Sequence, residues 1–402
     1  MNVSTLANLR TRERNFYLLL ALGGLLVAGG AWAAWAMHAH GHAITGMTNQ
    51  VVWGIPHVFA IFMIVAASGV LNVASVGSVF GKPVYKARAK LSGLLSLALL
   101  AGGLAVLMLD LGRPDRVVIA ATHYNPTSVF AWNVLLYSGL FAIVALYLWT
   151  MMERRMNRYS KYAGLAAFGW RFVLTTGTGV IFAFLVARQA YHSAVLAPMF
   201  IVMSLAWGMA IFLIAQAAIF AWHGREVDAA VRRRMARLLG IFVVAVLYFV
   251  IVYHLTNLYF ARQTDFERFI LVEGGIYPVL FWGGYVLLGT VAPLVLIYHP
   301  AFASSRMLLL ACGLVLAGAF AHLYVFIIGG QAYPLELFPG YVTSSSFFDG
   351  VIEHYRPSFP EIALGLGGVG VAFAATVLGL RVLPFMRVDE VAAVDEAEGK
   401  AG

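Results

Sequence analysis

Ten long apolar segments, separated by short polar stretches, run through the 402-residue chain. Each is close to the roughly 20 residues that an α-helix needs to cross a bilayer. They lack the polar–apolar alternation of membrane barrels, and open sheet edges are not tolerated in lipid, so helices are expected. The predicted spans lie near 16–37, 51–76, 91–109, 128–151, 164–187, 196–222, 238–260, 276–298, 307–329 and 361–384.

The pattern therefore predicts an all-α, polytopic membrane protein of about ten transmembrane helices. We expect a short segment, 1–15, then a transmembrane domain over 16–387, and a polar tail, 388–402, that is disordered. The repeated Ala-Arg-Gln at 187–189 and 261–263 suggests two related four-helix bundles, which leaves two extra helices.

Composition supports the membrane assignment. The chain is 61% hydrophobic and 11% charged, with a mean hydropathy of +0.84, whereas soluble domains carry about 25% charged residues. The single cysteine, Cys312, lies inside an apolar segment. It rules out an intrachain disulfide and any Cys-ligated iron–sulfur cluster or zinc site within this chain.

The net charge of +9 is a topology signal and does not indicate a nucleic-acid partner. Of the 27 lysines and arginines, 20 lie at the termini and the even-numbered loops, six lie in the other loops, and Arg171 lies inside a span. Because lysine and arginine accumulate on the cytoplasmic side, both termini are predicted to be cytoplasmic in a bacterial inner membrane. The loops 38–50, 110–127, 261–275 and 330–360 then face the periplasm, and 261–275 has the pattern of a short interfacial helix.

The segment between Met108 and Asn133, which we call the polar rim, holds an unusual number of polar and charged side chains at the edge of the hydrocarbon region. Asp110 either forms a helix-end ion pair with Arg113 or accepts a proton from a ligand. Asn125 and Ser128 are expected to cap the next helix, and a ligand-binding role is also open. The rim residues are Asp110, Arg113, His123, Tyr124, Asn125 and Ser128.

His57 follows Trp53 at the periplasmic start of the second span. It is either an interfacial histidine beside a membrane-belt tryptophan, or a donor to a quinone carbonyl that also relays a proton. A quinone needs polar donors on both sides of a flat ring and an apolar opening for its tail. His57 and the rim offer the donors if helices two to four are neighbours.

His254 and His322 lie at similar depth in the seventh and ninth spans. They suggest either the axial ligands of a b-type haem or a hydrogen-bonded polar layer with Tyr253, Asn257 and Tyr324. Only one such histidine pair is visible, and its neighbours are bulky, so the polar layer is preferred.

Arg171 lies one to two turns inside the fifth span. The simplest interpretation is that its side chain reaches back to the cytoplasmic headgroups. The alternative is a proton path that uses Arg171, Thr175, His254 and His322.

The chain resembles the NrfD/PsrC family of polysulfide-reductase-type membrane subunits. The resemblance rests on Asp110-x-Gly112-Arg113 and His123-Tyr124-Asn125-x-x-Ser128, together with Trp53-Gly54. Arg306-Met307-Leu308 and Arg381-Val382-Leu383-Pro384 are similar to the ten-helix branch, which includes HybB-type hydrogenase subunits. The last periplasmic loop, from Gly330 onward, is most similar to that of DsrP, the membrane subunit of the Dsr sulfur-metabolism complex.

This resemblance implies a subunit without haem or iron–sulfur cluster that exchanges electrons between a membrane quinone, menaquinone or ubiquinone, and a periplasmic ferredoxin-like iron–sulfur subunit. It implies a quinone pocket at the periplasmic side of spans two to five. With His57 and Asp110 exchanging protons and Arg113 orienting the acid, that pocket maps onto Trp53, His57, Asp110, Arg113, His123, Tyr124, Asn125 and Ser128. A secondary transporter, with broken helices and a polar site at mid-membrane, is the alternative class.

Overall fold

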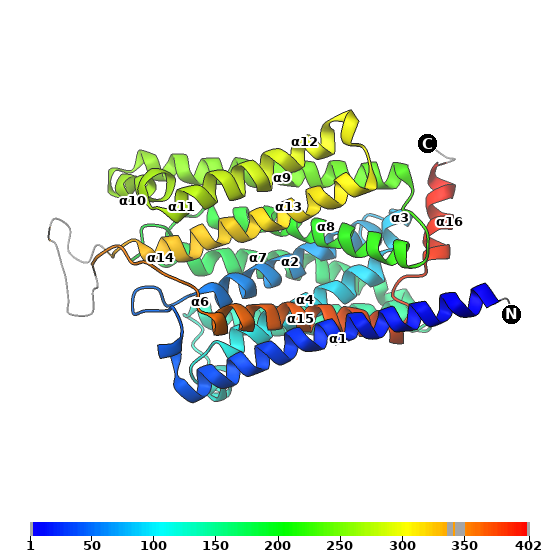
Figure 1. The fold of residues 1–402 in the computed structure, drawn as a ribbon, viewed down its shortest axis with the longest axis horizontal. Helices are drawn as coiled ribbons and strands as arrows, with labels where there is room; N and C mark the ends of the chain where they lie inside the picture. The colour runs from blue at the N-terminus through cyan, green and yellow to red at the C-terminus, as the bar shows by residue number, and fades with distance from the viewer. Residues whose placement is uncertain (1–2, 336–340, 342–349, 400–402) are drawn as a thin grey trace.

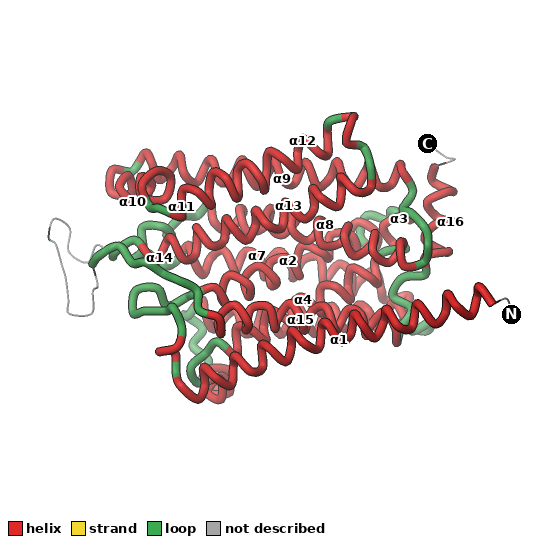
Figure 2. Tube along the Cα trace, in the orientation of Figure 1, coloured by secondary structure: helices red, strands yellow, loops and turns green. Residues whose placement is uncertain are grey.

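The computed structural model describes residues 3–335, 341 and 350–399, and within these it is built from helices without strands (Figure 2). Ten helical spans in this part of the chain are long and apolar enough to cross a membrane, which confirms the predicted number and the all-α class. They are α1 (Val3–His40), α2 (Ile55–Ser78), α4 (Ala89–Leu109), α6 (Val129–Met152), α7 (Ser160–Ala183), α8 (Leu196–Trp222), α9 (Ala229–Tyr259), a run from α11 (Ile276–Val279) through a π-helical segment to α12 (Ala292–Tyr298), a run from α13 (Ser305–Leu323) to α14 (Gly330–Ala332), and α15 (Phe359–Val382).

The helices pack as two groups of four and a pair. Helices α2, α4, α6 and α7 contact one another, and α8 and α9 pack with the α11–α12 and α13–α14 runs. Helices α1 and α15 lie side by side, and α15 packs on α4 and α2 (Figure 1). We call these the first bundle, the second bundle and the flanking pair. They match the expected two four-helix bundles plus two extra helices.

Helix α2 is the centre of the molecule. Its apolar window is 94% buried, against 17% for α1, because α2 contacts α4, α7, α8 and α15. The contact with α8 depends on two glycines, since a Cβ at Gly69 would lie 1.6 Å from the Ser204 carbonyl oxygen and one at Gly208 would lie 2.1 Å from the Gly69 carbonyl carbon. Small residues of this kind let membrane helices approach closely. The same packing joins the two bundles.

Both chain ends lie at one end of the molecule, which we call the termini end; the opposite end is the loop end (Figure 1). Loops gather at both ends (Figure 2). At the loop end, α10 (Thr264–Arg268) and a π-helical turn over Phe269–Glu273 lie in the 261–275 connection. The short helix expected there is therefore present. Much of the last loop, over 336–340 and 342–349, lies outside the described residues.

The expected disorder of the tail is wrong, because residues 388–399 form helix α16 (Val388–Gly399). It packs against α3 (Pro83–Lys86). Asp395 of α16 accepts two hydrogen bonds from Arg88, at 2.9 and 2.7 Å, and both side chains are almost fully buried. The Arg88 Nε also donates to Gln216 Oε1 of α8 at 3.0 Å. Composition alone favoured disorder, but this buried ion pair anchors the tail to both bundles.

We predict that replacing Asp395 with Asn destabilises the protein, because Arg88 would then be buried without a counter-charge. Breaking one side of a buried ion pair costs roughly 3–5 kcal/mol. We expect D395N to lower the thermal midpoint of the detergent-purified protein and to speed hydrogen exchange in 388–399.

The matched control is Asp389→Asn on the same helix. Asp389 pairs with Arg225 at 2.8 Å, but its side chain is 86% exposed, and exposed pairs contribute at most about 1 kcal/mol. Equal effects of the two substitutions would contradict the anchoring role of Asp395.

Candidate functional site

The structure brings His57 and Asp110 together, as expected if helices two to four were neighbours. Nδ1 of His57 on α2 lies 2.8 Å from Oδ2 of Asp110, and the two side chains are 16% and 1% exposed. The contact is not a well-aligned hydrogen bond, and neither carboxylate oxygen has a hydrogen-bond donor among the described residues. The two side chains are thus in close polar contact, and both have unused hydrogen-bonding capacity. This contact leaves Nε2 as the histidine nitrogen that can meet a ligand.

Asp110 occupies an unfavourable position for an anion. It is the residue that ends α4, and its N–H bonds the Val106 carbonyl at 2.9 Å. The end of a helix carries partial negative charge, which repels a carboxylate. By contrast, Asp228 begins α9 and accepts hydrogen bonds from two backbone N–H groups at 2.8 and 3.1 Å. Asp110 therefore gains nothing from its helix, and such unpaired buried polar groups are found at sites of function.

Aromatic rings border the histidine. Trp53 stacks on His57 with 5.8 Å between ring centroids and an interplanar angle of 26°. Trp53 also meets Phe182 edge to face at 5.7 Å and lies 6.4 Å from Phe130, whose side chain is 49% exposed. A stacked pair of rings beside an exposed phenylalanine is a surface on which a flat, apolar molecule can lie.

Gln331, which the sequence analysis missed, fixes the backbone that carries Trp53. Its Oε1 accepts from the N–H groups of Val52 and Trp53, both at 3.0 Å. Its Nε2 donates to the carbonyls of Trp53 at 3.0 Å and Ile327 at 2.9 Å. All four partners are backbone groups, so no sequence pattern marks them. Gln331 is 1% exposed and connects the second bundle to the entrance of α2.

Glu361 supports the same turn from α15. It forms a capping box with Ser358 and accepts from the Gly46 N–H at 2.8 Å. Tyr355 donates to its Oε1 at 2.6 Å and receives the Ile55 N–H at 2.8 Å. Burial is the main cause that raises the pKa of Tyr355 far above its usual range, and the hydrogen bond to Glu361 is the second. The phenol therefore stays protonated and acts as a donor. A side chain at position 54 would displace these groups, because a Cβ at Gly54 would lie 2.4 Å from Glu361 Oε1 and 2.7 Å from the Tyr355 hydroxyl.

Arg113 does not contact Asp110, so its expected pairing with that acid is wrong. Its Nε and Nη2 donate to the two carboxylate oxygens of Asp115, each at 3.2 Å, and both side chains are exposed. The hydrogen bond from Arg113 lowers the pKa of Asp115, and the same bond raises the pKa of Arg113. The chain turns sharply after α4, which directs Arg113 outward while Asp110 stays inside.

The remaining rim residues are separate from the His57–Asp110 contact. His123, Tyr124 and Asn125 are exposed, and Ser128 is half-buried. In the described part of the chain, none has a hydrogen bond or ring contact with His57 or Asp110. The expected side-chain cap at Ser128 is not formed, and Asn125 instead accepts from the N–H and hydroxyl of Thr127 at 3.0 and 2.7 Å.

Arg171 does not reach the headgroups, because it is only 3% exposed. Its guanidinium lies over the Phe172 ring, 4.4 Å from the centroid, and Nη1 donates to the Ser68 carbonyl of α2 at 3.4 Å. Thr175 returns a hydrogen bond to the Arg171 carbonyl at 2.8 Å. The side chain therefore points into the first bundle, where α2 and α7 meet. The proton path through Arg171 and Thr175 stays a prediction.

The second bundle contains another histidine–carboxylate contact. His254 Nδ1 lies 2.6 Å from Glu267 Oε2, and Asn257 donates to Glu267 Oε1 at 2.7 Å. Glu267, in α10, is fully buried. It takes the place expected for Tyr324, which instead lies 6.3 Å from the rings of Tyr277 and Tyr355. The expected polar layer is confirmed only for His254 and Asn257, which meet at Glu267; Tyr253 bonds the Ala190 carbonyl instead, and His322 bonds none of the described residues.

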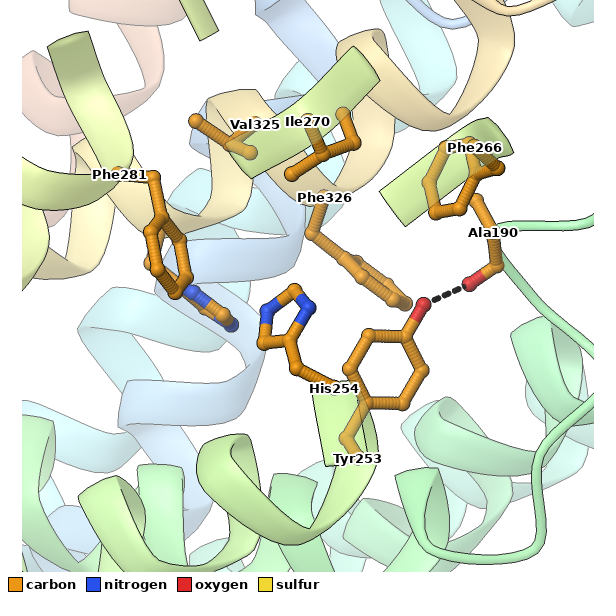
Figure 3. Close-up of a pocket in the computed structure, with 9 residues that line it drawn as sticks. Ala190, Tyr253, His254, Phe266, Ile270, Phe281, Val325 and Phe326 are labelled. Carbon is orange, nitrogen blue, oxygen red and sulfur yellow. Dashed lines mark hydrogen bonds between the residues drawn. The ribbon is translucent and has the colours of Figure 1, made fainter. Parts of the chain in front are cut away.

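A small cavity adjoins this layer. Figure 3 shows Tyr253 and His254 beside Phe281 and Phe326 around it, with the Tyr253 hydroxyl donating to the Ala190 carbonyl. His322 also lines the cavity, and neither of its nitrogens has a partner among the described residues. The cavity holds about 10 Å³, which suits one water molecule. This space is far smaller than a haem.

Comparisons with known proteins agree with this architecture. The family profile described as "Polysulphide reductase, NrfD" matches residues 43–334. The chain is similar to an Hdr-like menaquinol oxidoreductase integral membrane subunit of Archaeoglobus fulgidus, with 28% identity over 88% of this chain and 90% of that protein. It is also similar to a putative dimethyl sulfoxide reductase membrane subunit of Halobacterium salinarum, with 27% identity over 95% and 94%. A selenate reductase subunit of Mesobacillus selenatarsenatis is 20% identical over 86% and 89%.

We predict that Gln331→Met loosens the turn that carries Trp53. Methionine has a similar shape but cannot bond the four backbone groups, and leaving such groups unpaired costs about 1–3 kcal/mol each. Hydrogen exchange in the peptide containing Val52 and Trp53 should accelerate by about tenfold or more. Thr376→Val is the control, since that hydroxyl bonds only the Ala372 carbonyl of its own helix. Unchanged exchange in Gln331→Met would contradict the role given to Gln331.

Proposed function

Because the chain belongs to the NrfD family, we propose that it is the quinone-reactive membrane subunit of a multi-subunit redox complex. The observation that carries the proposal is the buried Asp110 carboxylate, 2.8 Å from His57 and without a hydrogen-bond donor among the described residues. The relative named a menaquinol oxidoreductase subunit makes menaquinol the first substrate to test, with ubiquinol second.

The residues around His57 fit a quinol head group. The unused hydrogen-bonding capacity of Asp110 and the free Nε2 of His57 match a hydroxyl or carbonyl oxygen. The stacked ring of Trp53 and the exposed ring of Phe130 match a flat, apolar ring. Exposed apolar side chains of α6, such as Leu135, 58% exposed, face lipid and leave an approach for the tail.

Oxidation of one quinol to the quinone releases two protons and two electrons. We infer that His57 accepts one of these two protons from a quinol hydroxyl at Nε2, and that the Asp110 carboxylate stabilises the resulting imidazolium until the Nδ1 proton passes to Asp110. The second proton follows the same route after Asp110 has released the first to solvent at the loop end. A small rotation of the imidazole would align the Nδ1 proton with the carboxylate. His123, Tyr124, Asn125, Ser128 and Arg113 then belong to the outer surface of the loop end.

We propose that the electrons leave through a ferredoxin-like iron–sulfur protein docked at the loop end. The excess of basic residues at the termini end supports a cytoplasmic position for that end in a bacterial inner membrane, and we therefore propose that the partner is periplasmic. The likeness of the last loop to DsrP makes a sulfur-metabolism complex one candidate assembly. A transporter is less favoured, since the relatives are named as oxidoreductase and reductase subunits.

We predict that Asp110→Asn lowers quinol oxidation by the assembled complex by about 100-fold or more, the usual contribution of a general base. Asparagine keeps the shape of the side chain but cannot take the proton. The measurement is quinol-dependent reduction of the complex's iron–sulfur clusters, in complexes shown to retain all subunits.

Asp115→Asn is the matched control. Asp115 is an exposed acid in the same loop and pairs with Arg113, so its loss should leave turnover within about twofold, since surface substitutions have small effects. If Asp110→Asn turns over quinol as fast as Asp115→Asn, the proton-accepting role of Asp110 is refuted.

A further inference from the structure

A large apolar cleft lies outside the His57–Asp110 site. Its volume is about 780 Å³, within the range of about 300–1,000 Å³ typical of ligand pockets. Its lining residues come from the flanking pair α1 and α15, from α8, and from α2, α4 and α13. The deep lining includes Phe62, Met63, Leu95, Leu99, Leu316 and Val369.

The cleft is polar at one end only. Glu13, His223 and Arg381 line it at the termini end. Trp222, beside His223, also lines this end, and the hydroxyl of Thr376 donates to the Ala372 carbonyl at 2.8 Å. The cleft therefore matches an amphiphile whose head group lies at the termini end and whose tail points toward the middle of the membrane.

Arg381 is available to bind an anion. Its guanidinium lies over the Phe16 ring, 5.4 Å from the centroid, and the side chain is exposed. Among the described residues it has no carboxylate partner. The ring Nδ1 of His223 bonds the Ile219 carbonyl at 2.9 Å, which leaves Nε2 free. Arginine beside an aromatic ring is well suited to a phosphate, while Glu13 disfavours a multiply charged anion.

The length of the cleft distinguishes between possible occupants. Along α15 it runs from Val369 to Arg381, about 18 Å at 1.5 Å per residue. This is close to one leaflet, half of a hydrocarbon core of roughly 30 Å. A partner's transmembrane helix would need a groove along the whole core. Water is not a suitable filling either, because the deep lining offers it no hydrogen bonds.

We propose that this cleft binds one glycerophospholipid of the leaflet at the termini end, with its phosphate at Arg381 and His223 and an acyl chain against Phe62 and Met63. The bound lipid completes the packing between the flanking pair and α8, where the protein itself leaves a gap. This proposal is independent of the quinone chemistry, since none of the cleft residues belongs to the His57–Asp110 site.

The test is native mass spectrometry of the full-length protein in mild detergent, with organic extraction and phosphorus analysis of the bound molecule. We expect one phospholipid per chain. Ala218→Trp fills the cleft from α8 and should reduce retention by about tenfold or more. Arg381→Gln should reduce retention while leaving the apolar lining intact, and it serves as the second variant if the tryptophan prevents folding.

Two control variants separate the cleft from general effects. Ala142→Trp adds the same ring to the exposed face of α6, away from the cleft. Arg387→Gln removes an exposed arginine that pairs with Glu390 at 2.7 Å near the same end. Both should retain the lipid. Equal retention in wild type and in Ala218→Trp and Arg381→Gln, or extraction of a quinone in place of a phospholipid, would overturn the proposal.

Discussion

A carboxylate buried at the end of a membrane helix, in contact with an imidazole and without a hydrogen-bond donor among the described residues, sets the main constraint on this structure. Taking Asp110 out of water is costly, and the end of α4 adds to the cost. His57 offsets part of it at 2.8 Å. The contact between His57 and Asp110 therefore depends on where α2 begins and on how it is oriented relative to α4. The surrounding residues fix both.

Three side chains, those of Gln331, Glu361 and Arg188, hold the turn before α2 in place. Gln331 bonds the backbone of Val52 and Trp53 from the second bundle, and Glu361 bonds Gly46 and Tyr355 from the flanking pair. Arg188 donates to the carbonyls of Gln331 at 3.0 Å and Gln50 at 2.7 Å. Both bundles and the flanking pair thus converge on one turn. This explains why a site formed by α2 and α4 belongs to a ten-helix domain rather than to the first bundle alone.

The two histidine–carboxylate contacts differ in how completely they are satisfied. Glu267 is bonded by both His254 and Asn257, whereas Asp110 has no donor in hydrogen-bond geometry among the described residues. A fully bonded buried acid stabilises and specifies packing, while an incompletely bonded one can respond to a ligand. The first bundle therefore carries the reactive pair in our account, and the second carries the structural one.

The sequence predicted the spans because bilayer thickness fixes their length, and it predicted the meeting of His57 and Asp110 because both lie where adjacent spans reach the same end. Partners distant in the chain were missed. Gln331 bonds Trp53 across 278 positions, and Arg88 bonds Asp395 across 307. Arg113 was assigned to Asp110 by proximity in sequence, but the turn after α4 directs it to Asp115. No local sequence pattern indicates which partner Gln331, Arg88 or Arg113 bonds.

The most direct measurement is a double-substitution cycle on quinol turnover, using His57→Ala, Asp110→Ala and the pair together. If the imidazole and the carboxylate handle the same proton as a unit, the double variant should be no slower than the slower single variant. Multiplication of the two losses would show that the side chains act independently, and would contradict the account.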